Sequence, residues 1–190
     1  MSENFSPQQS LQLIQTMIER TKTNLRENSF YFLLWGWVTF GAVLTQFFLK
    51  VVLEYRHHYL VWLVTIIALV ITIIYGNRQN KKQGYKTYLG ESMGNLWMGI
   101  GISFFILTII ISAGIGWLHA WPFFILFYGL GTFTSGKIIQ FKPLVVGGII
   151  CWLLAITCVF VQYDYQLLIA AAAILSSYII PGYLIKSKHL

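Results

Sequence analysis

The chain has 190 residues, of which 57% are hydrophobic and only 10% are charged, and its formal net charge is +7. Soluble domains carry about 25% charged residues, so this chain lacks the polar side chains that would cover a water-soluble fold of its length. The composition therefore excludes a soluble globular protein and indicates a membrane protein.

The first 28 residues are mostly polar and precede any long apolar stretch. Ser6, Pro7 and Gln9 match a helix start, with a capping hydroxyl, a proline in the first turn and a glutamine three residues after the cap. Apolar side chains then recur at amphipathic spacing at Leu11, Ile14, Ile18 and Leu25. We expect residues 1–28 to form a cytoplasmic amphipathic helix. Residues 7–27 either pack on the bundle and the lipid head groups, or bind a protein partner or a second copy of the chain.

Long charge-free stretches divide the rest of the chain. They cover residues 28–49, 57–77, 92–136, 143–163 and 165–185, and the third is 45 residues long while the others have 21 or 22. A helix needs about 20 apolar residues to cross a hydrocarbon core, so the third stretch holds two crossings, separated near Gly114 and Gly116. The pattern predicts an all-α fold in which residues 29–190 form six transmembrane helices, at 30–49, 59–75, 93–113, 121–135, 144–161 and 167–184.

Basic residues are divided unequally between the two sides that six crossings define. Eleven of the 13 Lys and Arg residues share the side of both termini, and only Lys50 and Arg56 lie on the other. Lys and Arg stay on the cytoplasmic side, so we expect a protein of the cell inner (plasma) membrane with cytoplasmic termini and three hairpins that open inward. This topology explains the positive charge without nucleic acid, and the lipid bilayer is the expected partner.

Glycine is frequent in the predicted third and fourth helices. In lipid, helices gain little from burying apolar surface against each other, and small residues let their backbones approach closely. Tight helix contacts are therefore expected at Gly94, Gly99, Gly129, Gly131 and Gly136. Trp152, inside the fifth predicted helix, is expected to face the bundle, because its indole N–H would otherwise lie in lipid.

Few groups in the predicted helices could carry chemistry. None of the six helices contains Asp, Glu, Lys, Arg or His, the groups that bind or exchange ions in pumps and coupled transporters. Gln46 is expected near the outer interface rather than in a transport pathway. Cys151 and Cys158 lie about 10 Å apart along one helix, too far for a disulfide, and should be buried and inert. The sequence therefore assigns no catalytic, cofactor-binding or metal-binding residue.

Polar residues from three loops are expected on the outer side. They are Glu54, His57, His58, His119 and Asp164. Imidazole and carboxylate groups suit Zn²⁺, but the spacing matches no metal-binding motif such as H-E-x-x-H. Solvated interface side chains are the favoured interpretation. The alternative is a metal site on the outer face, which would make the protein a membrane enzyme.

Two stretches carry a resemblance to other proteins. They are residues 27–37, which enter the first predicted helix, and residues 129–152, which end in Cys151-Trp152. Together they resemble a group of small bacterial six-span integral membrane proteins that has no assigned activity. The resemblance implies the six-span fold and no site residue.

The expected function follows from this pattern. We expect a non-enzymatic membrane protein that acts through protein or lipid contacts, as a regulatory, scaffold or assembly subunit. The alternative is a permease or channel-like transporter for a small neutral or apolar molecule, which a widened polar cavity between the third and fourth helices would favour.

Overall fold

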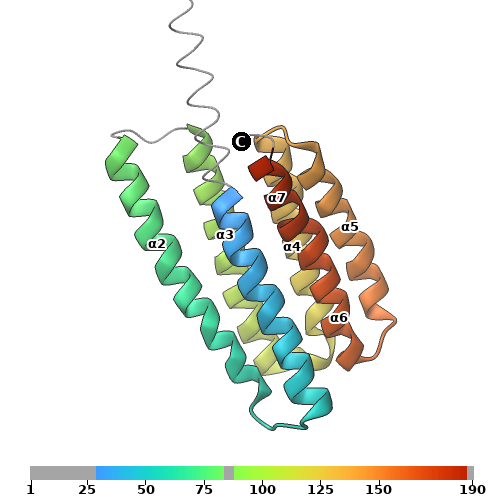
Figure 1. The fold of residues 1–190 in the computed structure, drawn as a ribbon. Helices are drawn as coiled ribbons and strands as arrows, with labels where there is room; N and C mark the ends of the chain where they lie inside the picture. The colour runs from blue at the N-terminus through green and yellow to red at the C-terminus, as the bar shows by residue number, and fades with distance from the viewer. Residues whose placement is uncertain (1–28, 84–87, 188–190) are drawn as a thin grey trace, which may run out of the picture.

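The computed structural model describes residues 29–83 and 88–187, and over those residues it contains helices and turns but no strand. The helices run side by side in one bundle, with Ser29 and Ser187 at the same end (Figure 1). We call this the proximal end, and we call the opposite end, which holds the turn between the first helix and α2, the distal end. The amphipathic helix predicted for residues 1–28 lies outside the described residues.

The helices follow one another through short connections. The first helix covers Ser29–Val52, and a 3-10 segment, His58–Leu63, leads into α2, Val64–Gln83. α3, Tyr88–Ile110, continues through a π-helical turn, Ile111–Ile115, and the turn Trp117–His119 precedes α4, Ala120–Ile138. α5 is Lys142–Val159, and α6, Tyr163–Ile174, passes through a π-helical segment, Leu175–Ile179, into α7, Ile180–Ser187.

Five described helical segments are long and apolar enough to cross a membrane: Ser29–Val52, His58–Gln79, Leu89–Gly114, Lys142–Val159 and Tyr163–Ser187. They coincide with the first, second, third, fifth and sixth predicted crossings. This confirms the all-helical prediction and supports a multi-pass membrane protein. α4 covers the fourth predicted crossing but is not among the five. Six crossings therefore stay a prediction.

Among α2 to α7, α4 and α5 make the most extensive contact. A Cβ atom added at Gly136 would lie 2.6 Å from the backbone nitrogen of Val145, and one added at Gly148 would lie 2.7 Å from that of Phe133. Real Cβ atoms essentially never approach another heavy atom within 3.0 Å, so this pair needs glycine at both positions. Trp152 packs on Gly129 of α4. The tight contacts predicted for the fourth helix, and the inward position of Trp152, are confirmed.

For the third helix the packing prediction was wrong. Gly94 and Gly99 are exposed, and a Cβ atom at either would meet nothing within 4 Å. The reason is that α3 turns its large residues toward α4: Trp97 and Ile100 occupy the space over Gly131. The glycine at this helix contact is therefore supplied by α4, and the glycines of α3 point away from it.

Burial is unequal among the crossing helices. In the most apolar window of Tyr163–Ser187, 56% of residues are buried inside the structure, against 11% for Leu89–Gly114 and 6% for His58–Gln79. The core is formed mainly by the first helix and α4 to α7, with fully buried side chains that include Val43, Leu144, Cys151 and Leu167. α2 and α3 thus lie at the margin of the bundle.

α2 is attached mainly to the first helix. The Trp35 indole N–H donates to the Thr72 hydroxyl at 3.0 Å. Nearer the proximal end, the ring of Phe30 stacks on Tyr75 with 4.0 Å between the ring centroids. These contacts, together with the polar contacts at the distal end described below, hold α2 in place.

Candidate functional site

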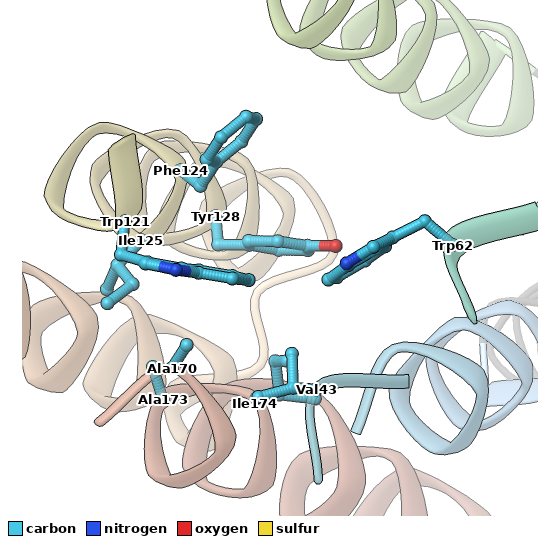
Figure 2. A pocket seen from close by; sticks show the side chains of 9 residues that line it. All are labelled: Val43, Trp62, Trp121, Phe124, Ile125, Tyr128, Ala170, Ala173 and Ile174. Carbon is cyan, nitrogen blue, oxygen red and sulfur yellow. The ribbon is translucent and has the colours of Figure 1, made fainter. Parts of the chain in front are cut away.

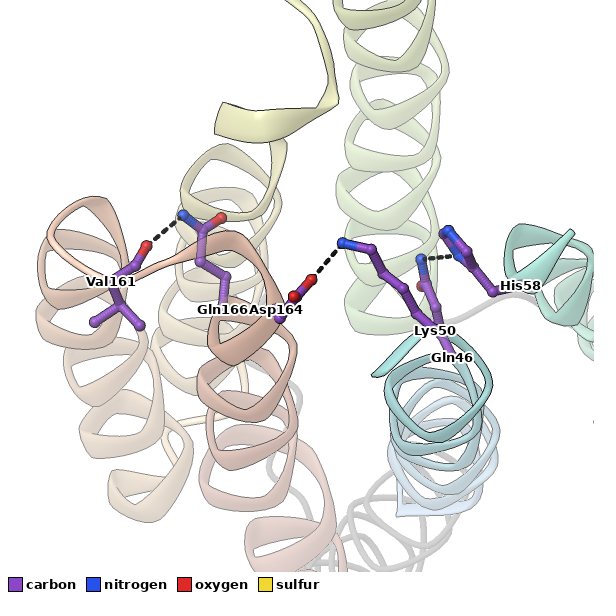
Figure 3. Close-up of polar contacts among 6 residues, drawn as sticks. All are labelled: Gln46, Lys50, His58, Val161, Asp164 and Gln166. Carbon is purple, nitrogen blue, oxygen red and sulfur yellow. Dashed lines mark hydrogen bonds and ion pairs between the residues drawn. The ribbon is translucent and has the colours of Figure 1, made fainter. Parts of the chain in front are cut away.

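Polar side chains meet at the distal end, where the first helix, the start of the second crossing and α6 come together (Figure 3). We call this group the distal polar cluster, and its members are Gln46, Lys50, His58, Trp62, Tyr163 and Asp164. The first two lie one turn apart on the first helix, and His58 and Trp62 have the same spacing on the facing segment. Residues four apart project from one face of an α-helix, so Gln46 and Lys50 both point into the junction. His58 and Trp62 lie on a 3-10 segment, where four-residue spacing does not define one face, and both contact Gln46.

Gln46 joins the first helix to the second crossing. Only 4% of its surface is exposed, and its Oε1 accepts a hydrogen bond of 2.7 Å from Trp62 Nε1 while its Nε2 lies 3.2 Å from His58 Nδ1. An indole N–H only donates, so the amide oxygen must face Trp62 and the amide NH₂ must face His58. His58 Nδ1 is therefore an acceptor, and the neutral ring carries its proton on Nε2.

Lys50 joins the first helix to α6. Its ammonium group forms an ion pair with the Asp164 carboxylate and lies 3.8 Å from the centroid of the Tyr163 ring. The two paired side chains remain 27% and 48% exposed. An ion pair as exposed as this contributes about 0–1 kcal/mol. The ion pair therefore links the first helix to α6 but adds little to the free energy of unfolding.

The predicted outer polar group does not come together as a metal site. Among the described residues, which include all five members, no group of three His, Cys, Asp or Glu side chains could hold a metal ion. His57 Nδ1 lies 3.0 Å from the Tyr59 hydroxyl, and Glu54 and His119 are exposed. Only His58 and Asp164 belong to the distal polar cluster, where their partners are Gln46 and Lys50.

Sequence reasoning missed the residues that organise this cluster. In the sequence, Lys50 indicates only topology, through its charge, and no pattern distinguishes Trp62. The available signal was the four-residue spacing of Gln46 with Lys50 on the first helix. That spacing shows which side chains share a face, but pairing with Asp164 requires the arrangement of α6.

A small cavity lies beside the cluster, between the first helix, α4 and α6 (Figure 2). Its volume is about 10 Å³, room for roughly one water molecule. Apolar and aromatic side chains surround it, and the Tyr128 hydroxyl points across it toward Trp62. Its lining consists of Val43, Trp62, Trp121, Phe124, Ile125, Tyr128, Ala170, Ala173 and Ile174. This cavity is too small to hold a solute.

A second candidate site is the outward face of α3. We call it the α3 face, and it comprises Asn95, Met98, Ile102, Phe105 and Ile109, all of which are exposed. Three exposed glycines flank it at positions 94, 99 and 101, and a Cβ atom at any of them would meet nothing within 4 Å. The side chain of Asn95 makes no hydrogen bond within the described part of the chain. This face therefore combines apolar, small and polar residues that have no partner among the described residues.

Comparison with known proteins adds no assignment to either site. No protein-family model matches the chain, and neither a curated protein nor a solved structure matches it.

Proposed function

We propose that this protein is a non-enzymatic integral membrane protein that acts through contacts with another protein inside the bilayer, as a regulatory, scaffold or assembly subunit. The observation that carries the proposal is the unequal burial of the helices. α4 to α7 pack against one another and against the first helix, while α3 leaves exposed a face that differs in composition from an ordinary lipid-facing surface.

The comparison with α5 supports this. α5 also has an exposed face, which consists of Val146, Ile149, Leu153 and Ile156. Such side chains suit contact with lipid tails. The exposed Thr157 beside this face donates its hydroxyl to the Leu153 carbonyl within the helix. The α3 face differs by its exposed Asn95 amide and by the open glycines beside it. Small residues and hydrogen-bonding side chains are the features that favour association between helices in membranes.

The proposed topology has six crossings, with α4 as the fourth and both termini in the cytoplasm. α4 has 19 residues, and its second half contacts α5, from Gly129 against Cys151 to Gly136 against Val145. A helix packed along a membrane-crossing partner shares its depth in the bilayer. The excess of Lys and Arg on the side of the termini supports the orientation.

Thiol labelling tests this topology. In a Cys151→Ala, Cys158→Ala background, Gln83→Cys and Ser187→Cys should be protected from an impermeant maleimide in intact cells. Gln162→Cys, in the exposed turn between α5 and α6, should be labelled. Labelling of Gln83→Cys from outside would refute the proposed orientation.

Photo-crosslinking in native membranes tests the function. A photoreactive amino acid is introduced at Met98 or Phe105 of the α3 face, which are 62% and 68% exposed. Leu153 of α5, which is 61% exposed, serves as the matched control position. We expect protein adducts from both α3 positions and lipid adducts alone from Leu153. Lipid adducts alone from all three positions would refute a role for the α3 face in protein contacts.

The N-terminal segment is the second proposed contact. Residues 7–27 are proposed to bind a cytoplasmic partner, on the strength of their amphipathic spacing. Affinity purification from native membranes with the full chain and with residues 1–28 deleted tests this. The partner should be lost with the segment, and its retention would show that residues 1–28 are not needed.

A further inference from the structure

We propose that His58 senses pH: protonation of its ring breaks the hydrogen-bonded junction between the first helix and the second crossing, so that α2 is held more weakly at acid pH. This inference concerns the distal polar cluster and is independent of the α3 face. Three side chains carry it, Trp62, Gln46 and His58, which two hydrogen bonds link in that order (Figure 3 draws the second).

The two hydrogen bonds can run in only one direction. The Trp62 indole N–H can only donate, and it lies 2.7 Å from Gln46 Oε1, so the Gln46 amide presents its NH₂ to His58 Nδ1 at 3.2 Å. An NH₂ group is also only a donor. The contact therefore requires a lone pair on His58 Nδ1, which the neutral ring has when its proton is on Nε2.

Protonation removes that lone pair, because both nitrogens of a charged imidazole ring are donors. Two N–H groups would then face each other between His58 and Gln46. If the Gln46 amide turned over, its oxygen would face His58, but its NH₂ would face the Trp62 indole N–H. Either orientation leaves one pair of donors facing each other, so no rotation of the amide restores both hydrogen bonds.

The burial of Gln46 makes this loss matter. Only 4% of its surface is exposed, so water cannot replace the lost partner as it would at an open surface. His58 is only partly buried, so a proton from water can reach its ring. The group that titrates is therefore accessible, while the group that loses its partner is not.

The charges around His58 offer the protonated ring no replacement partner. Lys50 of the first helix and Asp164 of α6 act on the ring with opposite signs, and they form an ion pair with each other. Among the described residues, no carboxylate forms an ion pair with His58. The ring of Tyr59 lies 6.1 Å from that of His58, between centroids, and the Tyr59 hydroxyl is in contact with His57. The other titratable side chains of the preceding turn, Glu54, Tyr55 and Arg56, are exposed.

α2 is the helix on which this loss acts most strongly. Only 6% of the residues in the most apolar window of His58–Gln79 are buried, the lowest share among the five apolar helical segments. Apart from the junction, its attachment to the first helix includes the Trp35–Thr72 hydrogen bond and the stacking of Phe30 on Tyr75. The distal end of α2 therefore depends on the junction at Gln46.

Thermal unfolding of the full chain in detergent tests the proposal. The midpoint temperature is compared at about pH 7.5 and about pH 5, on either side of the ordinary histidine pKa of about 6.5. His58→Asn is the reference, because its amide oxygen can accept from Gln46 as Nδ1 does and does not titrate. The wild-type midpoint should fall by about 3–6 °C relative to the reference as the pH is lowered, since the stability is present while the ring is neutral and is lost when it is charged.

His57→Gln is the matched control, at the exposed neighbouring histidine, and it should keep the pH dependence of the wild type. An equal pH dependence in His58→Asn and the wild type would overturn the proposal. So would a wild-type midpoint that does not fall relative to His58→Asn.

Gln46→Glu should reverse the effect. A carboxylate accepts on both sides, so it suits the Trp62 indole N–H and a protonated His58 together. The midpoint of this variant should not fall relative to that of His58→Asn over the same pH range. A fall as large as that of the wild type would contradict the proposed role of the amide.

Nitrogen NMR of the histidine rings tests the starting state in the wild-type chain, whether or not Gln46→Glu folds. The signals of His58 are assigned by their absence from His58→Asn. At about pH 7.5 the His58 ring should carry its proton on Nε2 alone. A ring protonated on Nδ1 at that pH could not accept from Gln46 and would overturn the proposal.

Discussion

Gly148 of α5 and Gly94 of α3 are the same residue type in two membrane-crossing helices, but their surroundings differ. Where a Cβ atom would stand at Gly148, the backbone nitrogen of Phe133 is 2.7 Å away, whereas at Gly94 nothing lies within 4 Å. Gly148 makes a helix contact, and Gly94 makes none with the part of the chain that the structure describes. In lipid, apolar burial does not separate inside from outside, so the neighbours of a small residue decide its role.

The largest expected effect tests this comparison directly. Gly148→Leu places a side chain against the Phe133 backbone, which has no room to move aside, so we expect a loss of at least about 3 kcal/mol in the free energy of unfolding. Gly94→Leu, the matched control, should change it by less than about 0.5 kcal/mol. The yield of monodisperse protein and its thermal unfolding in detergent measure both. Equal losses would mean that α3 packs inside the bundle after all.

A smaller effect is expected at the junction that holds α2. Gln46→Leu removes the acceptor of the Trp62 indole and the donor to His58, and a buried group left without its partner costs about 1–3 kcal/mol. The midpoint temperature of thermal unfolding should fall accordingly. Thr45→Val, at the exposed neighbouring position, should leave the transition unchanged.

The same variant shows whether α2 is held separately from the packed helices. Ala68 on α2 and Ala170 on α6 are 1% and 3% exposed. In a Gln46→Leu protein without native cysteines, Ala68→Cys should react faster with maleimide, while Ala170→Cys should keep its rate. Equal acceleration at both sites would show that the bundle loosens as one unit.

The smallest expected effect concerns the link between the first helix and α6. A double-mutant cycle with Lys50→Met and Asp164→Asn should give a coupling free energy below about 1 kcal/mol, because both side chains are partly exposed. Added salt should reduce it further. A coupling above about 2 kcal/mol would mean that the pair is shielded from water and contributes to the stability of the bundle.

The sequence could predict residues of the distal polar cluster but not their partners. Gln46, His58 and Asp164 were each expected on the outer side, from their places at the ends of charge-free stretches. That His58 pairs with Gln46 depends on how the first hairpin closes. That Asp164 pairs with Lys50 depends on α6 lying beside the first helix, across 114 residues of chain.

The sequence by itself determined where the helices lie, through its apolar stretches, charges and turn residues. A helix in lipid satisfies its backbone hydrogen bonds within its own segment, so it needs only a sufficient apolar length. Which face of α3 meets α4 was decided only by the tertiary structure. Glycines 94, 99 and 101 of α3 look equivalent in the sequence to Gly129, Gly131 and Gly136 of α4. They differ only in whether a neighbouring helix lies against them, and that neighbour is fixed by packing between distant segments.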